Sequence, residues 1–265
     1  MNKKITLILV SFLFAISTAF SNNDTFFFEN DIFTVVKNEI QNNLVGKSAI
    51  EGLAKDSSIK NYSAPVSTYY VKTVASGAGN GSTWADASSD LQGILNIAAS
   101  GEQIWVAAGT YMPTQDYSGS NSPSNARTKT FKLKDGVGLY GGFVGTETVL
   151  SERNAATNET ILSGDIGDSG DNTDNSYHVV IGNNLTNTAI FDGFTVQDGN
   201  ANSGLSYNYD GHLFYATKGG GLFNFSSTYT ISNISFRNNN GENGGAMMNS
   251  SSNITINDCK FISNT

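Results

Sequence analysis

Four aspartates recur at every third position within one glycine-rich stretch of this 265-residue chain. The stretch reads SGDIGDSGDNTDN, and the four residues are Asp165, Asp168, Asp171 and Asp174. Carboxylate oxygens on a glycine-flexed loop are the ligands that calcium prefers, although this spacing is not that of an EF-hand loop. Acidic surface turns are also common in asparagine-rich exported proteins. A structural calcium site and a solvated acidic turn both stay open, with the turn preferred, and no other cofactor is expected.

A second candidate site is an aromatic loop between residues 200 and 218, which carries Tyr207, Tyr209, His212 and Tyr215. Aromatic rings with a few polar groups on an external loop could stack against a sugar or a protein partner. Alternatively, the rings could lie flat on the outside of the folded core. We take these four residues as candidate ligand-binding residues.

Other chemical motifs are weak. Gly136, Gly138 and Gly141 match the dinucleotide fingerprint in spacing, but no helical pattern follows them, so they are interpreted as turn residues. The single cysteine, Cys259, rules out an internal disulfide and a cysteine-based metal site. A net charge of -8 disfavours nucleic acid as a partner, because phosphates need Lys and Arg.

The scaffold for these residues is indicated by a repeat from Gly219 to Thr265. At a spacing of 25, Gly219 aligns with Gly244, and the same spacing relates the pairs Asn224 and Asn249, Ile231 and Ile256, Phe236 and Phe261, and Asn239 and Asn264. A fixed period with recurring apolar residues is typical of a solenoid.

A repeat unit of this length, without a helix pattern, has room for three short strands and three turns. Stacked units would form parallel sheets at roughly 4.8 Å spacing, with equivalent residues directly above one another. Leu222 over Met247 would then form an inward apolar stack, and Asn224 over Asn249 an amide ladder at a bend. Glycine and asparagine suit bends that need positive φ. The sequence therefore predicts an all-β parallel β-helix, in preference to a β-sandwich or a propeller.

The chain before the repeat is predicted to carry a helix and irregular coils. Asp90 can cap a helix whose apolar face is Leu91, Ile94, Leu95 and Ala98, and this helix should cover the apolar end of the first coil. Expected strands are 103–107, 130–133, 137–140, 160–162, 178–181 and 189–196. Because Val196 and Phe236 match in pattern but lie further apart than one period, we expect one period plus an external insertion between them.

The N-terminus has the layout of a signal peptide, with Lys3 and Lys4 before an apolar stretch and a small-x-small cleavage site at residues 19–21. We therefore expect three parts: a signal peptide (1–21), a poorly structured leader (22–68) and the β-helix domain (69–265). The mature chain should contain no transmembrane segment. The last residues stop inside a repeat, so we expect a domain truncated at its C-terminal end.

Paired motifs in the repeat resemble those of chlamydial polymorphic outer-membrane proteins. They are Gly-Gly-Ala at 244–246 with Phe-x-x-Asn at 261–264, and an earlier copy at 219–221 with 236–239. About three quarters of the chain is similar to exported bacterial right-handed parallel β-helix proteins, through stretches such as GSTWADASSDLQ, GEQIWVAAGTY, FKLKDGVGLYGGF and FDGFTVQDGNAN. The resemblance implies the pectate-lyase-like superfold in a secreted or outer-membrane, cell-surface protein.

Pectate lyases share this architecture, so an enzyme must be considered. Elimination from a uronate needs a cation and a strong base, yet Lys218, Arg237 and Lys260 are the only basic residues after Ala155, and they occupy different repeat positions. A hydrolase needs two facing carboxylates, which the sequence does not identify. We therefore assign no catalytic residues. The preferred function is an adhesin-like or structural scaffold that binds extracellular polysaccharide or a surface protein of a host or neighbouring cell. The alternative is the N-terminal part of a polysaccharide lyase or glycoside hydrolase.

Overall fold

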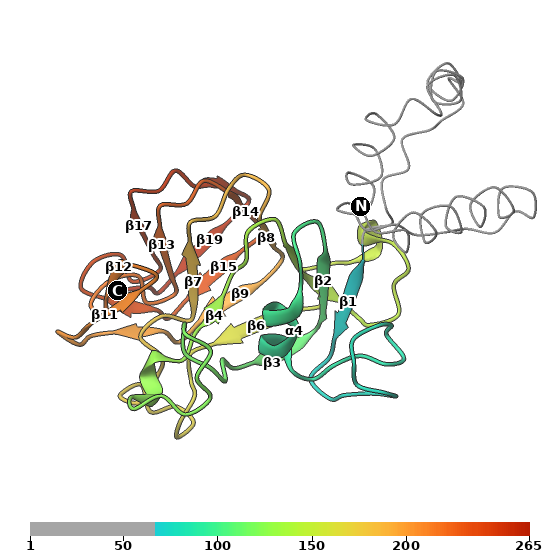
Figure 1. The fold of residues 1–265 in the computed structure, drawn as a ribbon, viewed down its shortest axis with the longest axis horizontal. Coiled ribbons are helices and arrows are strands. Elements are labelled where there is room, and N and C mark those ends of the chain that lie inside the picture. Colours follow the sequence, from blue (N-terminus) through green and yellow to red (C-terminus); the bar gives the residue numbers. More distant parts are fainter. Residues whose placement is uncertain (1–66) are drawn as a thin grey trace, which may run out of the picture. The chain divides into compact units, whose positions relative to one another are not determined.

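The computed structural model describes residues 67–265, whose regular structure is almost entirely short β-strands joined by turns and loops (Figure 1). The predicted signal peptide, and the predicted leader up to residue 66, lie outside the described residues. The first strand, β1 (Thr68–Val71), begins at the last residue of that leader. One short α-helix, α4 (Leu91–Ile97), and two 3₁₀ turns, η1 (Ala126–Thr128) and η2 (Leu150–Glu152), complete the regular structure. The predicted all-β class is confirmed. No helix in the described part is long and apolar enough to cross a membrane.

Most strands belong to three sheets in which all neighbours run parallel. The six-stranded sheet contains, in order, β1, β2 (Gln103–Ala107), β5 (Gly138–Phe143), β8 (Ile190–Asp192), β14 (Thr230–Ser232) and β18 (Thr255–Asn257). The five-stranded sheet contains β3 (Gly109–Tyr111), β6 (Thr160–Ser163), β9 (Thr195–Gln197), β15 (Ser235–Arg237) and β19 (Lys260–Ile262). The four-stranded sheet contains β4 (Phe131–Lys132), β7 (Val180–Asn183), β13 (Leu222–Phe225) and β17 (Met247–Ser250).

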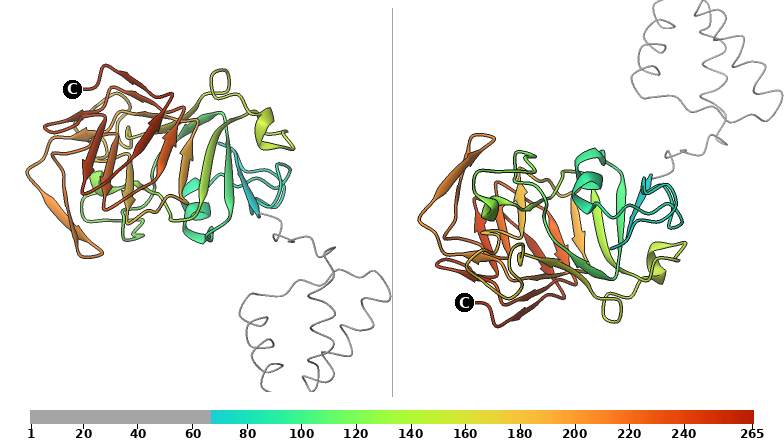
Figure 2. Two further views of the ribbon diagram at one scale, coloured as in Figure 1. Left: turned by 90° about the horizontal axis from the view of Figure 1, so that it is seen from above. Right: turned by 90° about the horizontal axis from the view of Figure 1, so that it is seen from below.

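The chain visits these sheets in a fixed order, from the four-stranded to the six-stranded and then to the five-stranded sheet. A further small pair, β10 (Asn200–Ala201) with β16 (Asn240–Gly241), follows the five-stranded sheet in two of the circuits. The same order recurs from β4 to β19, and Figure 2 shows the strands lying across the stack in successive layers. The main apolar core lies between the sheets and runs from Val71 to Phe236.

The predicted pairing at a spacing of 25 is confirmed in all three sheets of the last circuit. Leu222 pairs with Met247, Ile231 with Ile256 and Phe236 with Phe261. The rings of Phe236 and Phe261 stack with centroids 5.2 Å apart. The predicted insertion is confirmed as well, because Phe236 pairs with Val196 on its other side. Inserted residues form an antiparallel hairpin of β11 (Ser206–Tyr209) and β12 (His212–Tyr215).

Residues with positive φ stand at equivalent bends of successive circuits. After strands of the four-stranded sheet these residues are Asn184, Ser226 and Ser251. After strands of the six-stranded sheet they are Gly193, Asn233 and Asp258. After strands of the five-stranded sheet they are Asp198, Asn238 and Ser263. Asparagine, aspartate and glycine enter this left-handed region at least cost, which explains why the bends are rich in them. Gly193, with φ of 87°, also divides the expected strand 189–196 into β8 and β9, so the single-strand prediction was wrong.

Asparagine side chains join adjacent circuits. The Asn239 Nδ2 group donates to Asn264 Oδ1 at 3.0 Å, and the Asn224 Nδ2 group donates to Asn249 Oδ1 at 2.8 Å. Asn239 lies at a bend, as predicted. Asn224 does not, because it is fully buried within β13 and accepts a hydrogen bond from the Tyr229 hydroxyl at 2.8 Å. The Asn224 side chain therefore accepts a hydrogen bond from the buried Tyr229 hydroxyl and donates one to Asn249 on the neighbouring rung.

The predicted helix is present, with the Asp90 carboxylate accepting from Gly93 N at 2.9 Å as its N-cap. It covers the start of the stack at one sheet only. The helix contacts β2 and β4 and stands where a further strand of the four-stranded sheet would lie beside β4. The outer edge of β1 is covered instead by residues 81–88, since Tyr70 N donates to Gly81 O and Lys72 N to Ser88 O. Helix and loop thus protect the edges of two different sheets.

Candidate functional site

Three of the four aspartates of the acidic loop accept hydrogen bonds within their own turns. Asp165 accepts from Gly170 N at 3.1 Å, Asp174 accepts from Asp168 N at 2.7 Å, and Asp171 accepts from the amide and hydroxyl of Thr173. These two donors lower the pKa of Asp171. Among residues 67–265, no three acidic, histidine or cysteine side chains are grouped to hold a metal ion. Calcium at this loop stays a prediction.

Two of the candidate tyrosines lie against the body of the protein. The Tyr209 ring is 4.8 Å from the Tyr117 ring, and burial raises the pKa of Tyr209 to about 12. Tyr207 lies 6.1 Å from Tyr177, and burial likewise raises its pKa. Phe214 of the same hairpin lies beside the Tyr209 ring and is fully buried against Phe223 of the four-stranded sheet. The inner face of the hairpin therefore packs on the outside of that sheet.

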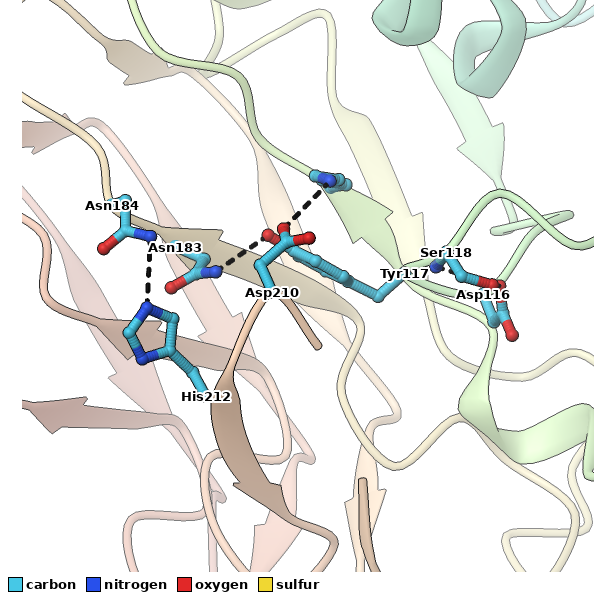
Figure 3. A network of polar contacts seen from close by, with 8 residues as sticks. Asp116, Tyr117, Ser118, Asn183, Asn184, Asp210 and His212 are labelled. Atoms are coloured by element: carbon cyan, nitrogen blue, oxygen red, sulfur yellow. Dashed lines mark hydrogen bonds and ion pairs between the residues drawn. The ribbon is translucent and has the colours of Figure 1, made fainter. Parts of the chain in front are cut away.

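Polar contacts fasten the end of the hairpin (Figure 3). The Asp210 carboxylate lies 3.7 Å from the Lys132 ammonium, which also sits 4.0 Å from the centre of the Tyr117 ring. The Asn183 amide donates to the Tyr117 hydroxyl at 3.0 Å. His212 Nε2 lies 3.2 Å from Asn184 Nδ2, so His212 too is engaged with the sheet (Figure 3).

Tyr215 is the most exposed of the four candidates. Its residue is 41% exposed, and the Lys218 ammonium lies 4.4 Å from its ring centre. The structure thus gathers Tyr207, Tyr209 and His212 on the packed side of the hairpin, with Tyr215 on the opposite side. A ligand-binding role for all four together would require the hairpin to leave the sheet.

A groove lies on the outer side of the five-stranded sheet, in a place that the sequence did not indicate. It comprises a cavity of about 320 Å³ and an adjoining, more open hollow of about 690 Å³, which share Ala155, Ala156 and Asn233. Thr195, Ser235 and Lys260 line it from three paired strands. Since Val196 and Phe236 point into the core, alternation along the strand turns these residues outward.

Five charged side chains line the groove: Glu159, Asp258, Arg237 and Lys260 in the cavity, and Arg153 in the adjoining hollow. Arg237 Nη1 lies 2.7 Å from Glu159 Oε1, which also accepts from the Thr195 hydroxyl at 2.8 Å. Lys260 and Asp258 form no ion pair with any residue between 67 and 265. The groove therefore offers a free ammonium and a free carboxylate beside one neutralised pair.

A second ion pair shapes the wall of the groove. Arg153 Nη2 lies 2.6 Å from Asp192 Oδ2, and both side chains are only 15% exposed. Asn233 donates to the other Asp192 oxygen at 2.8 Å, and Arg153 Nη1 donates to Gly141 O at 3.0 Å. These bonds hold the segment after η2 against two circuits of the stack. Arg153 therefore positions the wall through both of its terminal nitrogens.

Sequence reasoning missed this groove because Arg237 and Lys260 stand at different repeat positions, two places apart. Outward positions of one strand alternate with inward ones, so side chains two places apart can share one face on adjacent strands. That relation was available in the sequence. The presence of Glu159 in the groove could not be predicted from the sequence, because Glu159 belongs to the loop before β6 and has no counterpart in the repeat.

The chemistry that these groups support is hydrogen bonding to a polar ligand. The Glu159 carboxylate is held by a guanidinium, and both arginines near the groove are paired. Burial raises the pKa of the Asp198 carboxyl group, which does not line the groove. Residues 67–265 thus present no pair of free carboxylates facing each other in this groove.

One buried histidine lies apart from the groove. The His178 Nδ1 group donates to Gly219 O at 3.1 Å, while its Nε2 atom is buried without a partner in the described part of the chain. Burial lowers the pKa of His178 to about 4, so the ring is neutral at pH 7. The bond ties the segment just before β7 to Gly219, the residue that follows the insertion.

Comparison of the chain with protein-family models, curated protein sequences and solved structures gives no match.

Proposed function

We propose that the chain is a right-handed parallel β-helix exported to the cell surface or beyond it, where it acts as an adhesin-like or structural scaffold. The observation that carries the proposal is the repeated circuit through three parallel sheets, with residues 25 apart paired in each. Parallel strands joined by crossovers are almost always right-handed, which supports the handedness.

Export is supported by the signal-peptide layout of residues 1–21 and by the resemblance of the repeat to polymorphic outer-membrane proteins. N-terminal sequencing of the exported protein tests it directly. A mature chain starting at Asn22 is expected. A retained Met1, or retention of the protein inside the cell, would contradict export.

A binding scaffold agrees with the state of the ionisable groups. Arg153 and Arg237, the arginines beside the polar groove, are occupied by Asp192 and Glu159. A lyase needs a free base at the reacting carbon, and a hydrolase needs an acid and a second carboxylate. Within residues 67–265 the groove has one unpaired cation, Lys260, and one unpaired carboxylate, Asp258, so it lacks the second free carboxylate that a hydrolase needs.

The second candidate function is polysaccharide cleavage, as a lyase or a glycoside hydrolase. The specific observation in its favour is the groove itself, in which Glu159, Asp258, Arg237 and Lys260 lie along one sheet. Asp258 and Lys260 would be the first residues to consider as acid and base, because neither is engaged in an ion pair within residues 67–265.

Incubation of the full chain with acidic and neutral polysaccharides, with and without calcium, separates the two functions. The scaffold proposal predicts no new reducing ends and no absorbance from unsaturated uronates. Cleavage that disappears in Glu159→Gln or Asp258→Asn, and persists in Glu242→Gln on an exposed site outside the groove, would replace the scaffold by an enzyme.

A further inference from the structure

We propose that the groove on the five-stranded sheet binds a neutral, hydroxyl-rich chain, that is, an uncharged oligosaccharide. The proposal rests on the scaffold function and gives that scaffold a ligand class. Thr195, Ser235 and Lys260 stand on three successive strands, which are spaced at roughly 4.8 Å. Ser235 and Lys260 present accessible polar groups on two adjacent rungs, whereas the Thr195 hydroxyl is buried and donates to Glu159. Polar groups repeated from rung to rung suit a polymer better than a single small ion.

The balance of charge argues against an anionic ligand. The Glu159 and Asp258 carboxylates balance Arg237 and Lys260, and Asp192 neutralises Arg153, so these residues create no net field that draws in a polyanion. A hydroxyl group both donates and accepts, and it can therefore satisfy the free Asp258 carboxylate and the free Lys260 ammonium at once. Asn233 at the groove wall already donates to Asp192, which leaves its carbonyl oxygen to accept from a ligand.

A peptide ligand fits the groove less well. β9 and β15 each have a paired neighbour on both sides, so among the described strands that line the groove only β19 leaves a backbone edge for an added strand. Phe194 and Ile234 line the cavity but are only 2% and 1% exposed, so neither opens an apolar pocket for an anchoring side chain. The polar side chains remain the main contact surface.

The affinity should be modest. Among the described residues, Phe194 is the only aromatic one in the groove lining, and its buried ring provides no stacking platform for a sugar face. Binding would then rest on a few hydrogen bonds, and a dissociation constant of about 1 mM, or somewhat tighter for longer chains, is expected.

Calorimetric titration of the full chain tests the proposal. The probes are neutral gluco-, xylo- and galacto-oligosaccharides, with polygalacturonate as the anionic counterpart, each at low and high salt. The variants are Ser235→Trp, which fills the groove, and Asp258→Asn and Lys260→Gln, which remove one charge each. Glu242→Gln and Lys129→Gln change the same charges outside the groove lining and serve as matched controls.

At least one neutral oligosaccharide should bind the unmodified chain and both controls, with no effect of salt. Asp258→Asn and Lys260→Gln should each weaken binding about tenfold, as expected for the loss of one hydrogen bond to a charged group. Ser235→Trp should abolish binding while its circular dichroism spectrum stays unchanged. If Ser235→Trp does not fold, the two charge variants decide the matter.

Three results would overturn the proposal. One is the absence of binding by every neutral probe, and another is binding that neither Asp258→Asn nor Lys260→Gln weakens. A third is opposite effects of the two charge variants, with Lys260→Gln weakening and Asp258→Asn tightening a salt-sensitive interaction, because that pattern identifies an anionic ligand. Cleavage of a bound polymer would refute the scaffold function while leaving the ligand class intact.

Discussion

Acidification from pH 7 to pH 4 should destabilise the fold through His178. This ring is buried, its Nδ1–H is bonded to Gly219 O, and its pKa is lowered from 6.5 to about 4. The unfolded chain takes up a proton below pH 6.5, whereas the folded chain does so only near pH 4. The stability that the neutral ring contributes is therefore present above pH 6.5 and is lost as the pH falls from 6.5 to 4.

The size of the loss follows from the shift in pKa. Each unit corresponds to about 1.4 kcal/mol, so the span from 6.5 to about 4 gives a loss of about 3 kcal/mol. Other carboxyl groups titrate in the same range, and a variant is needed to isolate the histidine. His178→Gln keeps a side-chain N–H for the Gly219 carbonyl and removes the titration.

Urea unfolding, followed by circular dichroism at several pH values, measures the effect. The unmodified chain should lose about 3 kcal/mol more than His178→Gln between pH 7 and pH 4. His212→Gln, which removes the only other histidine, should behave like the unmodified chain. Equal losses in the unmodified chain and in His178→Gln would refute the assignment of a buried, neutral ring.

Three further predictions concern the stack and the acidic loop. Asn239→Ala should lower the free energy of unfolding by about 2–5 kcal/mol, because the buried Gly199 N–H and Val196 carbonyl lose their hydrogen-bond partner. The control is Asn253→Ala, on an exposed site. An Asn239→Ala effect no larger than that of the control would contradict the role of the asparagine ladder. Gly199→Ala should destabilise the protein by more than about 3 kcal/mol, because a Cβ at this position would overlap the Gly220 carbonyl. Gly204→Ala, whose Cβ would meet no atom within 4 Å, should leave the stability unchanged. Thermal unfolding of both variants measures the difference. Chelation with EDTA should leave the melting temperature unchanged, since the carboxylates of Asp165, Asp171 and Asp174 accept hydrogen bonds from amides of their own loop. A lower melting temperature that added calcium restores would instead establish a calcium site in this loop.

The regular part of the fold was predictable because its rungs keep a constant length. Ile231 and Ile256 pair at the same spacing as the other aligned positions of the repeat, so apolar residues and asparagines reveal the pairing directly. The position of the hairpin also followed, since Phe191 and Val196 keep the internal spacing of Ile231 and Phe236 despite the insertion.

The earlier rungs could not be aligned from the sequence. Ile104 pairs with Leu139, and Leu139 pairs in turn with Phe191, so two successive rungs differ widely in length. Loops of different length between short strands remove the period on which the alignment depends. For the same reason the partner of each early strand, and the place of α4 beside β4, required the structure.

The candidate sites, too, were predictable only in part from the sequence. Tyr207 and Tyr209 were found from composition, but their direction depends on Tyr117 and Tyr177, which come from loops outside the repeat. The groove depends on Glu159 meeting Arg237, which belongs to a later circuit of the stack. Sequence spacing carries no signal of that contact, because the loop that delivers Glu159 occurs once.

The pairing of residues 25 apart on parallel strands underlies the scaffold and its groove, and proton contacts measured by NMR test it most directly. The account predicts amide contacts between the strands of Leu222 and Met247, of Ile231 and Ile256, and of Phe236 and Phe261, without short Hα–Hα contacts between them. Short Hα–Hα contacts, which mark antiparallel neighbours, or pairing at any other spacing in this region, would contradict the account.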